Sequence, residues 1–424
     1  MPVTLHIDGL SSGSDGVARL DGRVVFVAGG VPGDVVEAEL VEEKERSARA
    51  RIVRVVTPSP DRVEPGCAHA SDCGGCSWLH VSAQGQAKAK QAILRDALGR
   101  IGGVELGEAS LNPLIRSPLA LRYRRRATLH LSGGRIGYRA ASSHVLVEIE
   151  GCPQLAPRLE QAIPRLREAL KAEGAPPKCT DIALACDERR ITAAFEVAAA
   201  GKSTLEKVRR LMARARLDGA VLAVEGQRGQ PLGDALLSWP APLAEGVTAY
   251  GRADLFAQAN PEANLLLVGE ALRMLGEGGE SLLELYSGAG NFSFAAARRF
   301  KAATCIESSP DAVELARRSA REAKVENVRF IQGDALACAE SLAKEGRRFE
   351  TLLLDPPRAG AKGIGKVAER SGVRRVVYVS CDPATLSRDV KELQESGYRL
   401  IEATPVDMFP QTFHLETVAR LDRG

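Results

Sequence analysis

The sequence predicts a multidomain chain: an N-terminal OB-like β-barrel, a central α+β domain and a C-terminal Rossmann-like α/β domain. Residues 1–57 alternate polar and apolar side chains between glycine-rich turns, residues 112–240 mix strands and helices, and strands and helices alternate regularly from about residue 262. A chain of 424 residues is long enough for several domains. We therefore expect domains over 1–57, 58–245 and 246–424.

The bulk composition is that of an ordinary globular protein. Of the residues, 45% are hydrophobic and 26% charged, and the net charge of +3 by itself indicates little about nucleic acid. The sequence has no apolar run long enough to span a bilayer, and the N-terminus lacks the basic-then-apolar order of a signal peptide. We expect a cytoplasmic monomer with no membrane partner.

The first 57 residues predict a small barrel of five short strands. The strand segments read VTLHIDGL, GVARLDG, RVVFVAG, DVVEAELVEE and ARARIVRVV. Such a barrel often binds nucleic acid, although strands alone also fit a purely structural appendage. Thr57-Pro58-Ser59-Pro60 reads as the linker that ends the module.

Nine cysteines are distributed unevenly along the chain. In a cytosolic protein they are a poor candidate for a disulfide framework. Cys67, Cys73 and Cys76 form a C-x5-C-x2-C cluster, which with a remote fourth cysteine could bind zinc as easily as an iron–sulfur cluster. The tighter C-x3-C-x2-C spacing usual in radical enzymes is absent. Four other cysteines lie in apolar contexts and are predicted to be core: Cys179, Cys186, Cys305 and Cys338.

An amphipathic helix is predicted over 82–101, and the α+β pattern follows it. Within this region, 112–140 contains no acidic residue, while tyrosines are interleaved with arginines at 116, 122, 124, 125, 126, 135 and 139. Guanidinium groups suit phosphates, and aromatic faces suit splayed bases. The alternative is a solvated strand edge guarded by charge.

The C-terminal region predicts a mostly parallel, doubly wound sheet. Ligands bind such sheets at the carboxyl ends of the strands. The predicted strands cover 281–287, 302–308, 328–334, 351–357, 376–382, 399–409 and 416–422. The predicted helices cover 264–275, 292–300, 311–324, 336–345, 362–370 and 385–396.

Polar residues at successive strand ends predict a nucleoside pocket. Gly288 and Gly290 let the backbone approach a ligand closely, but Ser293 replaces the third glycine of a dinucleotide fingerprint. Any one acid at a strand end could be a helix cap, whereas several together favour S-adenosylmethionine over NAD. We expect Glu307 on the ribose, Asp334 at the adenine edge and Asp355 at the fourth strand end. Asp355-Pro356-Pro357 suits the floor for a flat base, or else a stiff loop.

VYVSCDPATLSRDV (377–390) places Cys381 where a strand passes to a helix. Uracil C5 is a poor nucleophile, but a thiolate added at C6 makes C5 able to attack a methyl donor, and a base must then remove the C5 proton. The helix dipole at Cys381 is expected to lower the pKa of its thiol. Glu416 is the candidate base and His414 the reserve. Covalent capture also requires the base to leave its stack.

Four segments resemble the uracil-C5 RNA methyltransferase family, which makes 5-methyluridine in ribosomal and transfer RNA. They read LELYSGAGNFSF, LLLDPPRAG, VYVSCDPATLSRD and FPQTFHLE. GVARLDGRVVFVAGGVPGD resembles that family's TRAM module, and CAHASDCGGC resembles its iron–sulfur segment. The resemblance covers nearly the whole chain and implies a class I S-adenosylmethionine methyltransferase domain at the C-terminus.

The resemblance also implies roles for single residues. Cys381 would be the nucleophile and Glu416 the base. The residues that would bind the methyl donor are Gln258, Tyr286, Gly288, Gly290, Asn291, Glu307, Asp334 and Asp355. The ligands of a 4Fe–4S cluster would be Cys67, Cys73, Cys76 and Cys152, and the cluster would shape the RNA surface rather than do redox work. The helix after the cluster would pack on the catalytic domain.

The expected substrate is RNA, with 23S ribosomal RNA favoured and transfer RNA possible. The TRAM module and the cluster together favour the ribosomal substrate. A non-catalytic RNA-binding or ribosome-assembly protein is the alternative, against which the intact Cys381 and Glu416 argue. Amino-group methylation often uses Asn-Pro-Pro-aromatic, whereas this chain has Asp-Pro-Pro-Arg.

Overall fold

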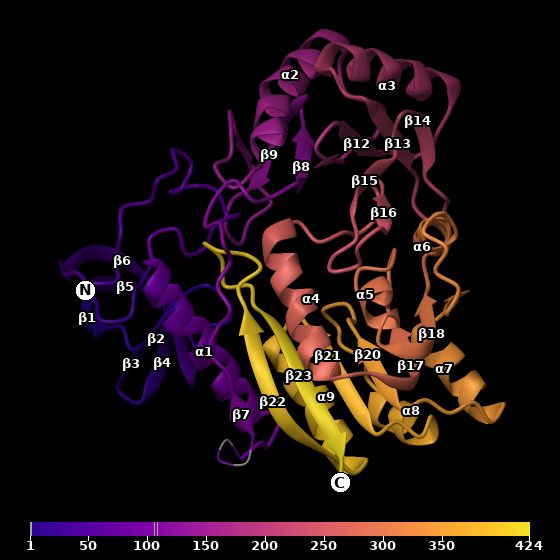
Figure 1. Ribbon diagram of the computed structural model, residues 1–424. Helices are drawn as coiled ribbons and strands as arrows, with labels where there is room; N and C mark the ends of the chain where they lie inside the picture. The colour runs from indigo at the N-terminus through magenta and orange to yellow at the C-terminus, as the bar shows by residue number, and fades with distance from the viewer. Residues whose placement is uncertain (1, 106, 108) are drawn as a thin grey trace.

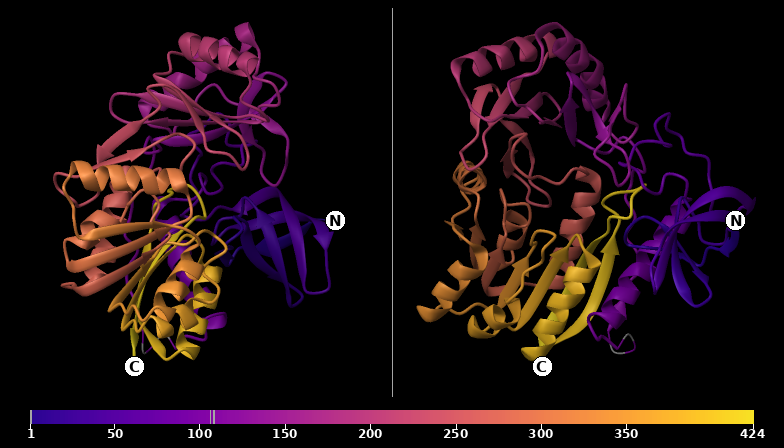
Figure 2. Two further views of the ribbon diagram at one scale, coloured as in Figure 1. Left: turned by 90° about the vertical axis from the view of Figure 1, so that its right-hand side faces the viewer. Right: turned by 180° about the vertical axis from the view of Figure 1, so that it is seen from behind.

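The computed structural model describes residues 2–105, 107 and 109–424. Figure 1 shows an N-terminal barrel, a central sheet covered by two helices, and a larger C-terminal sheet with helices on both faces. In Figure 2 the barrel stands as a separate lobe beside the C-terminal sheet in both views. No helix in these described stretches is both long and apolar enough to cross a membrane.

The N-terminal barrel has six strands rather than the five predicted. The sheet order is β1-β5-β6-β4-β3-β2, and β1 also contacts β3, so the sheet curls on itself. The first predicted strand is split because Ile7 N donates to Asp34 O while Asp8 N donates to Val17 O. The strands are β1 (Val3–His6), β2 (Gly9–Leu10), β3 (Gly16–Leu20), β4 (Arg23–Ala28), β5 (Val35–Glu43) and β6 (Ser47–Thr57).

Helix α1 (Ala83–Arg100) follows the cysteine segment and packs on the C-terminal domain. Ser82 caps it, since Ser82 Oγ accepts a hydrogen bond from Gly85 N at 3.0 Å. Leu94 and Leu98 of α1 are buried in the core beneath α9 (Pro383–Glu395). After α1, strand β7 (Ser110–Leu111) adds a parallel edge to the C-terminal sheet by pairing with β22 (Tyr398–Val406).

The central domain is a seven-stranded sheet of order β10-β9-β8-β11-β12-β13-β14, covered by α2 and α3. Strand β8 begins only at Arg126, because Arg122 has a positive φ of 60° and Arg122 N donates to Pro153 O. The elements are β8 (Arg126–Ser132), β9 (Arg135–Arg139), β10 (Leu146–Glu148), α2 (Pro157–Glu173), β11 (Asp181–Cys186), β12 (Ile191–Glu196), α3 (Lys202–Ala215), β13 (Gly219–Ala223), β14 (Gln230–Gly233), β15 (Leu237–Pro240) and β16 (Thr248–Gly251).

The C-terminal domain confirms the predicted alternation of strands and helices. Its sheet order is β19-β18-β17-β20-β21-β23-β22-β7, with only β23 antiparallel to its neighbours among the described strands. The strands are β17 (Gly279–Leu285), β18 (Phe300–Glu307), β19 (Val328–Gln332), β20 (Thr351–Leu354), β21 (Arg375–Ser380), β22 and β23 (Glu416–Arg423). The helices are α4 (Pro261–Leu275), α5 (Ser293–Ala297), α6 (Pro310–Glu322), α7 (Ala335–Lys344), α8 (Ile364–Arg370) and α9.

Successive residues of the central strands point into two separate cores. Leu282 and Leu353 pack with α4, α5 and α6, whereas Leu283 and Leu352 pack with α1, α7, α8 and α9. This is the pattern of a doubly wound sheet, in which both faces are covered and side chains alternate between them. The carboxyl ends of the parallel strands therefore form one edge, where the polar residues singled out above gather.

Candidate active site

The loop after β17 makes a tight turn in which three residues, two of them glycine, adopt a left-handed backbone conformation. Tyr286, Gly288 and Gly290 have φ values of 61°, 56° and 95°, in the left-handed region. A Cβ at Gly290 would lie 2.5 Å from the ring of Phe294, whereas a Cβ at Gly288 would meet no atom within 4 Å. Gly290 is thus needed for packing, and Gly288 faces open space.

The acids at the next two strand ends hold backbone amides. Glu307 accepts hydrogen bonds from Gly288 N at 3.0 Å and from Ser309 N at 2.8 Å, which ties the glycine loop to the start of α6. Asp334 is exposed and caps α7, where Asp334 Oδ1 accepts a hydrogen bond from Ala337 N at 2.9 Å. The helix-cap reading of a strand-end acid is therefore realised at Asp334, at the rim of the same edge.

Gln258 and Asn291 each form hydrogen bonds with a neighbouring segment. Gln258 is 6% exposed, and its carbonyl accepts a hydrogen bond from Arg125 Nε at 3.4 Å. Asn291 exchanges two amide hydrogen bonds with Asn264 of α4, at 2.8 and 3.0 Å. This pairing fixes the end of the glycine loop against α4.

Sheet register brings Cys381 and Glu416 together. Strands β21 and β23 are antiparallel with Ser380 opposite Thr417, so the next pair toward the sheet edge is Cys381 and Glu416. The neighbouring strand β20 ends one residue before Asp355. The thiol and the two carboxyl groups interact electrostatically, because both acids contribute to the pKa of Cys381.

Burial raises the pKa values of all three groups. It raises the pKa of Asp355 to about 7 and, with the charge of Asp355, the pKa of Glu416 to about 8. Burial followed by the charges of Glu416 and Asp355 raises the pKa of Cys381 to about 11, while Arg358 lowers it. The surroundings of this thiol and these two carboxyl groups thus disfavour their charged forms.

The expectation of a lowered thiol pKa was therefore wrong. The dipole of α9 is weakened at Cys381 because Asp382 caps the helix, and its Oδ1 accepts hydrogen bonds from Ala384 N at 2.9 Å and Thr385 N at 2.8 Å. Asp382 also adds a negative charge beside the thiol. Arg358, which directly follows Asp355-Pro356-Pro357, is the cation that favours the thiolate, and the sequence reading missed it.

His414 lies near the pair but is a weak base. Burial, together with the positive charges of Arg358, Arg124 and Lys90, lowers the pKa of His414 to about 4. Arg358 Nη2 lies 3.5 Å from both ring nitrogens. A neutral imidazole with so low a pKa accepts a proton less readily than Glu416, so Glu416 is the better candidate base.

The four cysteines assigned to a cluster are neighbours. Burial raises the pKa of Cys76 to about 12, and the charge of Cys152 adds to the shift; the pKa of Cys73 is raised by burial and by Cys152 and Cys67. Gly75 N donates to Cys73 Sγ at 3.4 Å. Within the described residues, however, no three His, Cys, Asp or Glu side chains are gathered closely enough to hold a metal ion. The four thiols are thus near one another, but they are not arranged as the ligands of a metal ion.

The remaining cysteines largely occupy the core, as predicted. Cys179, Cys186 and Cys305 are buried, and Cys338 is half-buried against the core beneath α7 and α8. Cys305 Sγ donates to Glu284 at 3.3 Å, and burial raises the pKa of Glu284 to about 7.

The middle of the arginine-rich stretch lies at a domain junction. The guanidinium of Arg125 stacks on Trp239 at 4.3 Å, and Arg126 donates to the carbonyls of Arg252 and Ala253. Phosphate binding is therefore the wrong reading for Arg125 and Arg126. The exposed arginines of the stretch are Arg116, Arg122, Arg135 and Arg139.

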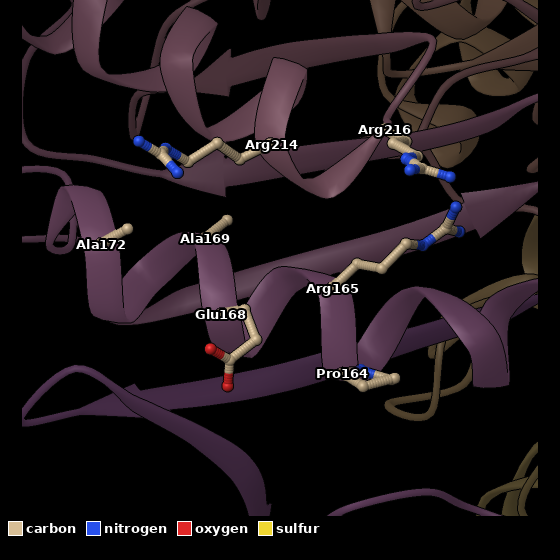
Figure 3. Close-up of a pocket in the computed structure, with 7 residues that line it drawn as sticks. All are labelled: Pro164, Arg165, Glu168, Ala169, Ala172, Arg214 and Arg216. Atoms are coloured by element: carbon tan, nitrogen blue, oxygen red, sulfur yellow. The ribbon is translucent and has the colours of Figure 1, made fainter.

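A large surface hollow, of about 680 Å³, lies elsewhere, between α2 and α3. Figure 3 shows Arg165 and Arg216 pointing toward each other across it while Glu168 points away. It shares no residue with the site predicted from the sequence. Its lining residues are Pro164, Arg165, Glu168, Ala169, Ala172, Arg214 and Arg216.

Comparison with known proteins gives matches over the whole chain. Residues 245–423 match the family model described as tRNA (Uracil-5-)-methyltransferase, and residues 3–53 match the TRAM domain. The chain is 35% identical to the 23S rRNA (uracil(1939)-C(5))-methyltransferase RlmD of Alkalilimnicola ehrlichii, with 100% of this chain and 97% of the relative covered. It is 34% identical to the RlmD of Pectobacterium atrosepticum, with 98% and 93% covered.

Among solved structures, the chain resembles the Pyrococcus abyssi tRNA (uracil-54, C5)-methyltransferase in complex with S-adenosyl-L-homocysteine. The TM-score is 0.74 and the sequence identity 26%, and the match covers 99% of each chain. The likeness therefore extends over all three domains.

Proposed function

Since the chain belongs to the RNA uracil-C5 methyltransferase family, we propose that it methylates C5 of a uridine in 23S ribosomal RNA, with S-adenosylmethionine as donor. The observation that carries the proposal is the register of β21 and β23, which pairs Ser380 with Thr417, so that Cys381 and Glu416 are the residues that adjoin this pair. Asp355 directly follows the neighbouring strand β20. This arrangement supplies both a nucleophile for uracil C6 and a base for the C5 proton.

The reaction uses the two side chains in sequence. S-adenosylmethionine supplies an electrophilic methyl group. The Cys381 thiol gives its proton to solvent, and the thiolate forms a bond to C6. The electrons of the C5–C6 double bond then make C5 nucleophilic enough to take the methyl group, while the sulfonium C–S bond of the donor breaks and S-adenosylhomocysteine leaves. Glu416 then removes the C5 proton, the C5–C6 double bond re-forms, and the thiolate leaves. The protein thus ends with its sulfur restored.

Proton transfer at neutral pH is favoured by the raised pKa values of the two acids. Asp355 at about 7 and Glu416 at about 8 are matched to exchange protons near the working pH. Arg358 lowers the thiol pKa and so stabilises the thiolate that must form.

The methyl donor binds at the carboxyl ends of β17 to β20. Gly288 and Gly290 give the backbone close approach, Glu307 is placed for the ribose hydroxyls, and Asp334 for the adenine edge. The open space beside Gly288 supports this placement. The other donor contacts are Gln258, Tyr286, Asn291 and Asp355.

The cysteine cluster Cys67, Cys73, Cys76 and Cys152 binds a 4Fe–4S group. Four thiols match the ligand set of such a cluster, although among the described residues they are not gathered in ligand geometry. Burial raises the pKa values of Cys73, Cys76 and Cys152, so bound iron would have to displace their thiol protons. Iron and acid-labile sulfide in protein purified without air test this assignment, since zinc would give metal without sulfide.

Covalent trapping tests the chemistry. RNA containing 5-fluorouridine at the target has no C5 proton to remove, so wild type should form an adduct that survives denaturing electrophoresis. Cys381→Ala should form none. A wild type that fails to trap, or undiminished trapping by Cys381→Ala, would contradict the mechanism and leave the non-catalytic RNA-binding reading.

The choice of RNA needs a separate test. The ribosomal substrate is supported by the names of the relatives, whereas the resembling Pyrococcus structure is a tRNA enzyme. In a strain lacking the gene, 5-methyluridine should disappear from 23S RNA and persist in transfer RNA. A loss confined to transfer RNA would assign the enzyme to that substrate instead.

A further inference from the structure

Glu416 follows an irregular segment, the β22–β23 loop (residues 407–415). The loop has no regular hydrogen-bonded ladder, and Gln411 within it has a positive φ of 70°, which a non-glycine residue adopts only when its surroundings hold it. The ladder of β22 and β23 ends at the pair Val406 and Glu416, so whatever fixes the loop that joins these two residues bears on the placement of Glu416.

Lys90 of α1 binds the start of the loop. Its side chain is 0% exposed, and Nζ donates to Asp407 Oδ1 at 2.6 Å and to Phe409 O at 3.2 Å. Lysine is almost never fully buried unless it is paired. A buried ion pair contributes little net stability compared with apolar packing, so fixing a conformation is the best-supported use for one.

Gln86 of α1, one turn earlier, binds the tip of the loop. Gln86 Nε2 donates to Gln411 Oε1 at 2.9 Å, and Gln411 N donates to Gln86 Oε1 at 2.9 Å. The same amide nitrogen donates to Val81 O at 2.8 Å. Residues four apart share a helix face, so α1 presents both side chains to the loop.

Other contacts brace the loop from the remaining sides. Tyr123 donates to Pro410 O at 3.2 Å, Asn260 donates to Met408 O at 3.1 Å, and Trp78 N donates to Gln411 O at 2.9 Å. Among these contacts, the side chains of Lys90 and Gln86 together bind both the start and the tip of the loop. Neither of them has a hydrogen bond to Cys381 or to the glycine loop.

We propose that Gln86 and Lys90 are positioning residues that hold the β22–β23 loop so that Glu416 faces the C5 proton of the covalently bound base. This inference rests on the proposed function, in which Glu416 acts only after methyl transfer. Losing either contact should slow proton removal while leaving thiol addition and methyl transfer intact. The methylated RNA should then remain attached to Cys381.

The test uses full-length Lys90→Met and Gln86→Met, which keep the length of each side chain but remove its hydrogen bonds. Lys88→Met is the matched control, since Lys88 lies on the same helix with its side chain 64% exposed. Single turnovers with a labelled methyl donor and natural RNA are stopped in denaturant. The label is then divided between free RNA and protein-bound RNA.

We expect Lys90→Met and Gln86→Met to raise the protein-bound fraction and lower kcat, each by about tenfold, because a misplacement of about 1 Å can cost up to a hundredfold in rate. KM should change less than about twofold, and Lys88→Met should match wild type. Trapping on 5-fluorouridine RNA counts the molecules with a working nucleophile and donor pocket, so loss of folded protein is corrected directly.

Two results overturn the inference. The first is a protein-bound fraction equal to that of wild type in Gln86→Met, the milder variant. The second is an equal decrease of labelled protein-bound RNA and labelled free RNA after correction for trapping. Such a decrease means that the substitution impairs all steps of the reaction and not proton removal alone. If the α1 variants accumulate no bound RNA, Glu416→Gln shows which proposal has failed. When Glu416→Gln also accumulates no bound RNA, the proposed mechanism fails. When it does accumulate bound RNA, only the proposed role of Gln86 and Lys90 is lost.

Discussion

The two glycines of the donor loop should respond differently to alanine. Gly288 has a φ of 56° and its added methyl would meet no protein atom, so Gly288→Ala carries only the left-handed backbone cost, about 1 kcal/mol of unfolding free energy. Gly290 has a φ of 95°, and its added methyl would lie 2.5 Å from Phe294, whose side chain is 2% exposed.

The larger cost at Gly290 follows from that contact. Carbon atoms pack at about 3.5–4.0 Å, so the Phe294 ring or the loop must move by about 1 Å. Overpacking a filled core costs about 1–3 kcal/mol, which adds to the backbone cost. Gly290→Ala should therefore lose about 3 kcal/mol of unfolding free energy, measured by urea denaturation without ligand.

Among folded molecules, Gly288→Ala should weaken donor binding more than Gly290→Ala does, which is the reverse of their order in stability. The methyl group of Gly288→Ala projects into the space assigned to the donor, so the Kd for S-adenosylhomocysteine should rise about tenfold, the loss expected for about 1.4 kcal/mol. Calorimetry at a temperature where both variants are folded measures it. Equal stabilities of the two variants, or wild-type binding by Gly288→Ala, would refute the geometry described for this loop.

Three further predictions concern charge and the cluster. The pKa of Glu416 is raised to about 8, so its contribution to stability is full below its ordinary value near 4.5 and lost as pH rises through 8; the Tm of Glu416→Gln should exceed wild type at pH 9 and approach it at pH 5. Asp34 is buried; despite that burial, Arg62 and two backbone amides lower its pKa, so its contribution is present above pH 3.8 and lost as pH falls through the lower folded value. Asp34→Asn should lose about 3 kcal/mol of unfolding free energy at pH 7, and the difference should shrink in acid; a constant difference would contradict the ion pair. Cys152→Ser should lose iron and sulfide while Cys338→Ser keeps both, and equal iron in the two variants would exclude Cys152 as a ligand.

Much of the fold followed from local patterns. In the C-terminal domain the period of the apolar residues, the caps and the turn residues agree, so every strand and helix expected there is present. The predictions that were wrong concern segments in which contacts with distant residues override the local sequence pattern. The first barrel strand divides because Asp34 and Val17 accept the hydrogen bonds of Ile7 and Asp8.

The site shows the same division. Strand ends and spacing were enough to select Cys381, Glu416 and the glycine loop as candidates, because a parallel sheet collects its strand ends at one edge. The role of Arg125 could not be read from its neighbours, since Trp239, its stacking partner, is more than a hundred residues away. The contact between Lys90 and Asp407 spans most of the chain and carries no sequence signal.

The sequence by itself determined the order of the domains and the residue types at the sheet edge, because periodicity and turn chemistry act between neighbours along the chain. Only the tertiary structure decided the pKa values of Cys381 and Glu416, the proposed nucleophile and base. Strands β20, β21 and β23 bring Asp355, Cys381 and Glu416 into one buried place, where desolvation and like charge outweigh a helix dipole that Asp382 already caps. Burial and the interaction of charges depend on distances in space between residues that are far apart along the chain, and a local sequence pattern does not contain these distances.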